Sequence, residues 1–144
     1  MTTIKVSIGA QIEKGPQVSI SKDIPVNTYD KIDEIVIAPG QERTVNVQPS
    51  SKDQISFLLI TSSLYTDPSK PEQKISYGVD APTIGLDQPH IYLGKGSVSV
   101  LGGDPKVLKF KNDYPAPAAD DKNAPKNEAK IEILVGRDAL QPSA

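Results

Sequence analysis

The sequence has no cysteine among its 144 residues, so it cannot form disulfide bonds, thiolate metal sites or a cysteine nucleophile. Tryptophan is also absent, and the aromatic residues are two phenylalanines and five tyrosines. Carbohydrate-binding sandwiches usually stack sugars on exposed rings, so the supply of such platforms is small. No segment approaches the roughly 20 consecutive apolar residues that a membrane-spanning helix needs.

The chain also lacks a strong excess of charge of either sign. Sixteen lysines and arginines face eighteen aspartates and glutamates, which gives a net charge of −2. Such a surface has no overall positive field that would gather nucleic acid. The first residues, MTTIKVSIGAQ, alternate between apolar and polar side chains and do not resemble a signal peptide. We therefore expect a cytoplasmic protein that contacts neither nucleic acid nor a membrane.

Histidine occurs once, at His90 in the segment DQPHIYLGKG. Histidine metal sites usually combine two or three imidazoles, and no GxSxG motif marks a serine nucleophile. We predict no metal, no cofactor and no enzymatic activity, and we expect His90 to be structural at the start of a strand. If the protein binds a small ligand, the candidate contacts are Asp87, His90 and Tyr92.

Thirteen prolines interrupt the chain and leave few intervals for a long helix. Between them the apolar residues recur with a period of two, which indicates strands with one buried face. The clearest examples lie in residues 4–8, 45–47, 75–79, 97–101, 108–110 and 131–135. This pattern predicts an all-β fold, an antiparallel β-sandwich or jelly-roll-like domain of about eight to ten short strands.

Three segments have distinct local predictions. Pro39-Gly40 suits a type II turn, because proline favours its second position and glycine its third. In residues 27–36, Tyr29, Ile32 and Val36 have helical spacing behind Thr28, so we expect a single helical turn that leads into a strand at 34–38, and at most two helical turns in the whole chain. Residues 113–128 lack Val, Ile, Leu and Phe, and we expect a mobile loop within a single domain spanning residues 1–144.

The segment ISFLLI, residues 55–60, departs from simple alternation. If Ile55, Phe57 and Leu59 face the core, Leu58 and Ile60 point outward. Each such side chain left in water forgoes roughly 1.5–3 kcal/mol of burial. By the same phase argument Val36, Leu134 and Tyr92 lie on the outward side of their strands. Either a loop of the same chain or another protein chain could cover this outer face.

These observations favour a non-catalytic structural or assembly protein that associates with itself or with another protein subunit. Small β-sandwich subunits of phage-like particles share its size and all-β pattern. The possible interface residues are Val36, Leu58, Ile60 and Leu134. The alternative is a β-sandwich module that binds a carbohydrate or another ligand.

Overall fold

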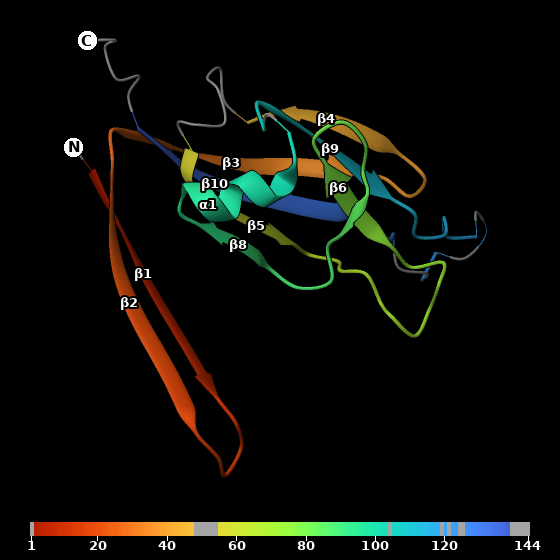
Figure 1. Ribbon diagram of the computed structural model, residues 1–144. Coiled ribbons are helices and arrows are strands. Elements are labelled where there is room, and N and C mark those ends of the chain that lie inside the picture. Colours follow the sequence, from red (N-terminus) through yellow and green to blue (C-terminus); the bar gives the residue numbers. More distant parts are fainter. Residues whose placement is uncertain are drawn as a thin grey trace.

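The alternating segments form ten strands within the part of the chain that the structure describes, and every strand pair is antiparallel. The computed structural model describes residues 2–47, 55–103, 105–118, 120, 122–123 and 126–138. Two four-stranded sheets pack face to face as a β-sandwich, and a two-stranded hairpin projects away from them (Figure 1). The predicted sandwich is confirmed, whereas the projecting hairpin has no counterpart in the sequence-based prediction.

The strands divide into three sheets. The first sheet has the order β3 (Thr28–Ile37), β10 (Ala129–Arg137), β5 (Ile55–Ser62), β8 (His90–Leu93). The second sheet has the order β4 (Glu42–Asn46), β9 (Val107–Asn112), β6 (Ile75–Gly78), β7 (Ile84–Gly85). The hairpin, here called the arm, consists of β1 (Thr2–Gln11) and β2 (Gln17–Val26).

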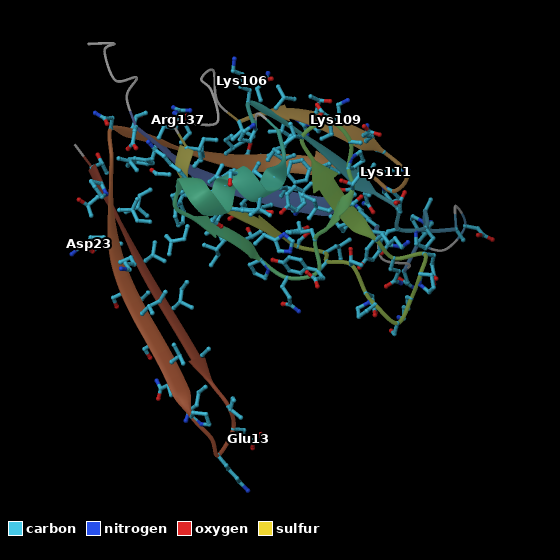
Figure 2. All side chains as sticks on the ribbon, viewed as in Figure 1. Glu13, Asp23, Lys106, Lys109, Lys111 and Arg137 are labelled. Carbon is cyan, nitrogen blue, oxygen red and sulfur yellow. The ribbon has the colours of Figure 1, made fainter. Side chains whose placement is uncertain are left out.

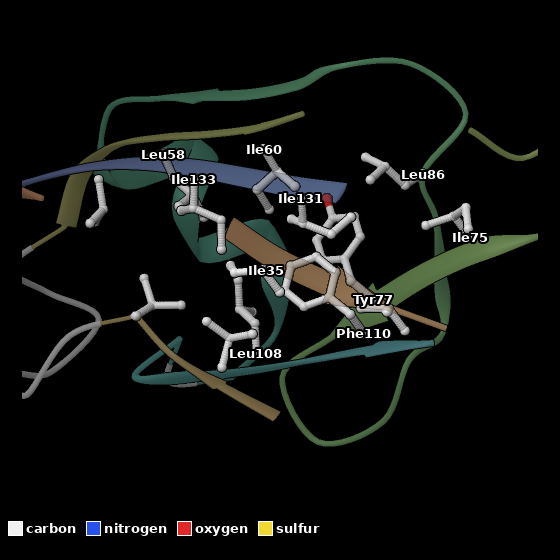
Figure 3. Packing of buried hydrophobic residues seen from close by; sticks show 14 of the residues in the cluster. Ile35, Leu58, Ile60, Ile75, Tyr77, Leu86, Leu108, Phe110, Ile131 and Ile133 are labelled. Atoms are coloured by element: carbon white, nitrogen blue, oxygen red, sulfur yellow. The ribbon is translucent and has the colours of Figure 1, made fainter. Parts of the chain in front are cut away.

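The hydrophobic core lies between the first and second sheets (Figure 3). Ile131, Ile133 and Val135 of β10 are fully buried, and the residues between them are exposed or half-buried. Leu108 and Phe110 of β9 alternate in the same way on the facing sheet. Period-two alternation therefore places one side of each sheet in the core, as the sequence predicted.

Residues 95–101 are helical, so the strand predicted at 97–101 is wrong. A four-residue helix, α1 (Lys95–Val98), runs into a 3₁₀ turn, η2 (Ser99–Leu101). Val98 and Leu101, three positions apart, are both buried, while Val100 is 77% exposed. Because these two apolar residues also fit a helical spacing, the short pattern could not distinguish strand from helix.

Residues 28–37 form β3, so the helical turn predicted in residues 27–36 is also wrong. Ile131 pairs with Ile35 and Ile133 pairs with Ile32, so β3 advances three residues where β10 advances two. The extra residue is a β-bulge in which Glu34 has a φ of 61°. This bulge lets Ile32 and Ile35 share the core face, whereas Tyr29 and Val36, the other two residues of the predicted helical spacing, are exposed.

The predicted turn at Pro39-Gly40 is present. The amide of Gln41 donates to the carbonyl of Ala38 over 3.0 Å, and Gly40 has a φ of 77°. A positive φ is readily adopted by glycine. The turn carries the chain from the first sheet to the second, since β3 and β4 belong to different sheets.

The loop after β9 is anchored at both ends by the buried side chain of Asn112. Its amide nitrogen donates to the carbonyls of Ile37 (2.9 Å) and Asn127 (2.8 Å), and its oxygen accepts from the Tyr114 amide (2.9 Å). The Tyr114 hydroxyl donates to the carbonyl of Tyr65 over 2.5 Å. These bonds order the described ends of the loop, and mobility between them stays a prediction.

Candidate functional site

The arm has one apolar face and one polar face. Cross-strand pairing places Ile4 opposite Ile24 and Ile8 opposite Ile20, with Ala10 opposite Val18. The opposite face pairs Lys5 with Asp23, Ser7 with Ser21 and Gly9 with Ser19. The apolar face of the arm therefore consists of Ile4, Val6, Ile8, Ala10, Val18, Ile20, Ile24 and Val26, interrupted by Lys22.

The apolar face of the arm becomes more exposed toward the tip. Val26 at the base is fully buried, whereas Ile20 is 42% exposed and Val18 is 67% exposed. Ile12 in the connecting turn is 65% exposed. In Figure 2, Glu13 marks the far end of the arm, away from Lys109 and Lys111 on the sandwich. An isolated two-stranded hairpin is marginally stable in water, so this face lacks the cover that such an element usually needs.

The base of the arm packs on the outer face of the first sheet, the face that points away from the core. Gly136 pairs with Phe57 and has the phase opposite to the buried Val135, so it faces outward. A Cβ at Gly136 would lie 2.6 Å from Ile4 Cδ1 and 3.0 Å from Val26 Cγ1. Glycine is required here because the arm crosses the sheet at van der Waals distance.

Beyond this crossing, the outer face of the first sheet is largely apolar. Cross-strand pairing puts Leu59 beside Leu134 and Ile91, and Phe57 beside Leu93. Ile91 is 43% exposed, and Leu59, Leu93 and Leu134 are half-buried. A hollow of about 130 Å³ opens on this face and is lined by Lys31, Leu59, Thr61, Glu132, Ile133 and Leu134.

The predicted interface residues divide between the outer face and the core. Leu134 lies on the outer face, and so does Val36, which is 36% exposed. Leu58 and Ile60 pair with Val135 and Ile133 and are fully buried in the core, so their predicted outward orientation is wrong. Phe57 and Leu59, predicted to face the core, lie on the outer face instead. Ile55 is in the core as predicted, because the pairing of β5 with β10 shifts register between Gly136 and Arg137.

The three predicted ligand contacts come together, with Tyr77 as a fourth member that the sequence did not indicate. The His90 ring contacts the Tyr77 hydroxyl through Nδ1 (2.6 Å) and Oδ1 of Asp87 through Nε2 (3.2 Å). The Tyr77 hydroxyl also hydrogen-bonds the Tyr92 hydroxyl. Tyr92 packs against the core, so its predicted outward position is wrong, because β8 pairs it with Leu58.

A neutral His90 ring gives every bond in this chain a donor and an acceptor. Tyr92 donates to Tyr77, Tyr77 donates to Nδ1 of His90, and Nε2–H of His90 donates to Asp87. Burial, and then the bond to Tyr92, raises the pKa of the Tyr77 hydroxyl far above its usual range. The hydrogen bond from His90 lowers the pKa of the exposed Asp87 carboxyl. The four groups thus satisfy one another, which suits a structural link between β6 and β8.

A groove of about 680 Å³ lies at another edge of the sandwich. It is lined by Asp30, Lys31, Ile32, Asp33, Asn46, Val47 and Arg137. The Arg137 guanidinium forms an ion pair with Asp30 over 2.5 Å, with its side chain 12% exposed. The carboxylates of Asp30 and Asp33 balance the positive charges of Lys31 and Arg137, so the groove favours neither anionic nor cationic ligands.

Two further sequence-based predictions concern metals and membranes. The described residues contain no group of three or more His, Asp or Glu side chains placed to hold a metal ion. This statement does not extend to Asp121, an acidic residue of the 113–128 loop, because it lies outside the described residues. Within the same described ranges, none of the helices has the length and apolar character to cross a membrane.

No protein-family model, curated protein or solved structure matches the chain. Its own geometry is therefore the basis for a functional proposal.

Proposed function

We propose that this chain is a non-catalytic structural or assembly protein that associates with itself or with another protein subunit through the apolar face of the arm. The single observation that supports this most is the exposure of Val18 and Ile20 on a projecting hairpin. Each branched aliphatic side chain left in water forgoes roughly 1.5–3 kcal/mol. A second surface that covers the arm recovers this free energy.

The alternative, a module that binds a carbohydrate or other ligand, draws less support from the same geometry. Its candidate contacts Asp87, His90 and Tyr92 direct their polar atoms at one another or at Tyr77. A ligand would have to compete with these internal hydrogen bonds. Within the proposed assembly role, the small all-β chain suits a subunit of a phage-like or other multi-subunit particle.

The test compares two neighbouring substitutions on opposite faces of β2. Ile20→Asp places a charge on the apolar face of the arm, and Ser19→Asp places the same charge on its polar face. Light scattering coupled to size-exclusion chromatography should show an oligomer for the unmodified chain and for Ser19→Asp, and dissociation for Ile20→Asp. Circular dichroism checks that both variants keep the β fold.

One result would count against the proposal, and another would narrow it. Equal behaviour of the two variants would show that the apolar face of the arm is not the association surface. A chain that keeps its mass of 15.4 kDa at every concentration would rule out self-association and leave docking to a different protein.

A further inference from the structure

Two uncovered apolar surfaces meet at the base of the arm. Ile4 and Val26 on the apolar face of the arm pack over Gly136 on the outer face of the first sheet. From there the arm leads away from the sandwich, as Figure 1 shows, and its side chains become progressively exposed. The outer face continues as Leu59, Leu134 and Ile91. Each chain therefore carries both an apolar arm and an apolar sheet surface.

The dimensions of the two surfaces correspond. The strands of the arm are ten residues long, and β3 and β10 of the first sheet have ten and nine residues. At about 3.4 Å per residue and about 4.8 Å per strand, one face of the arm covers roughly 330 Å². A single contact between two such faces buries about 650 Å² in total, which is the size of a crystal contact.

Reciprocal contacts bury a larger area. If each of two copies places its arm on the other copy's sheet, the total is about 1,300 Å², within the range of stable interfaces. Discounting the base of the arm, which already covers its own sheet, leaves about 900 Å², close to the lower bound of about 1,000 Å² for a specific interface. Packing of one arm against another would stay below that bound.

Each of the two surfaces carries one unpaired charge that the other can meet. Lys22, opposite Val6, is the only charged side chain on the apolar face of the arm. Glu132 lies on the outer face of the central strand β10 and lines the hollow of about 130 Å³ beside Leu59 and Leu134. Neither takes part in an ion pair among the described residues. The outer face also has two lysines: Lys31, beside Leu134, forms an ion pair with Asp33 over 3.6 Å, and Lys130 lies beside Val36. The hollow has several times the roughly 30 Å³ of a water molecule, so it can accept an aliphatic side chain.

We propose that the partner is a second copy of this chain, and that the two copies exchange arms. The apolar face of each arm lies on the outer face of the partner's first sheet, with Lys22 beside the partner's Glu132. This isologous arrangement closes on itself as a dimer. The inference rests on the proposed function and adds to it the identity of the partner and the surface on which the arm lies.

The test uses the two charge reversals separately and as a mixture. Lys22→Glu alone, or Glu132→Lys alone, sets like charges against each other at both contacts and should weaken dimerisation by about tenfold or more. In a mixture of the two variants, each arm meets a sheet of opposite charge, so heterodimers should recover the affinity of the unmodified chain. Sedimentation velocity measures both, and Lys109→Glu, a reversal on the second sheet, is the matched control.

The outcome of mixing separates exchange between chains from contacts within one chain. If each arm instead folded onto its own sheet, mixing would restore nothing, and the inference would be overturned. Single reversals that dimerise as tightly as the unmodified chain would also overturn it. Assemblies that grow beyond a dimer would refute reciprocal closure.

Crosslinking gives a second measurement that does not depend on charge. Because the chain has no cysteine, Ile20→Cys and Ile91→Cys each introduce a single thiol. A short bismaleimide added to the mixture of the two variants should link the thiol introduced at position 20 of one arm to the thiol introduced at position 91 of the other chain's sheet. If the main product instead links position 20 of one chain to position 20 of another, arms pack against arms. That result overturns this inference but leaves the proposed function standing. If all chains stay monomeric, both the inference and self-association fail.

Discussion

The orientation of β5 gives the sharpest prediction for the fold, because Leu58 and Leu59 are adjacent and point in opposite directions. Leu58 is fully buried between the sheets, where it pairs with Val135 and Tyr92. Leu59 is half-buried on the outer face beside Leu134 and Ile91. The substitution of each by alanine removes the same atoms from two different environments.

The expected losses follow from burial. A Leu→Ala substitution in a packed core lowers the free energy of unfolding by about 2–5 kcal/mol, through lost transfer energy and the cavity left behind. Leu59→Ala creates no closed cavity and removes a side chain that is already partly solvated, so we expect a loss of about 1 kcal/mol. The loss for Leu58→Ala is therefore a large part of a typical total free energy of unfolding, about 5–15 kcal/mol.

Urea unfolding followed by far-ultraviolet circular dichroism measures both losses, at a concentration low enough to keep the chain monomeric. Equal dependence of the two variants on urea concentration would show that only stability has changed. If Leu59→Ala cost as much as Leu58→Ala or more, the register of β5 against β10 would be wrong.

Two predictions concern the hydrogen-bonded chain at β8. Tyr77→Phe removes the hydroxyl shared by His90 and Tyr92 and should lower the free energy of unfolding by about 1–3 kcal/mol, whereas Tyr29→Phe, at an exposed position, should change it little in the same urea titration. Because the folded-state pKa of Asp87 is lowered, its stabilising contribution is present above the unfolded pKa of about 3.9 and is lost as the pH falls through the folded value. Asp87→Asn should therefore flatten the decline of stability below about pH 4, and an unchanged acid profile would contradict the bond to His90.

The sequence alone predicted several local features correctly. Alternation with a period of two identified β1, β6, β9 and β10, and Pro39-Gly40 identified a turn. These predictions depend only on neighbouring residues, because a strand with one buried face must alternate. The proximity of Asp87, His90 and Tyr92 also followed from their closeness in the chain.

Other features depended on contacts between distant residues. The segment 55–60 is apolar on both sides, so only pairing with β10 determines that Leu58, and not Phe57, faces the core. The bulge at Glu34 interrupts the alternation within β3, and it arises from register with a strand about 100 positions later in the chain. Tyr77 contacts His90 only because β6 and β8 lie in facing sheets.

The arm shows most clearly where local pattern stops and tertiary structure decides. Ile4, Val6 and Ile8 alternate as strictly as Ile131, Ile133 and Val135, and both runs form strands. The second run is buried because the other sheet packs over it, while the first extends past the edge of the sandwich. Alternation determines that a strand has an apolar face, but only the path of the whole chain determines whether its own residues cover that face.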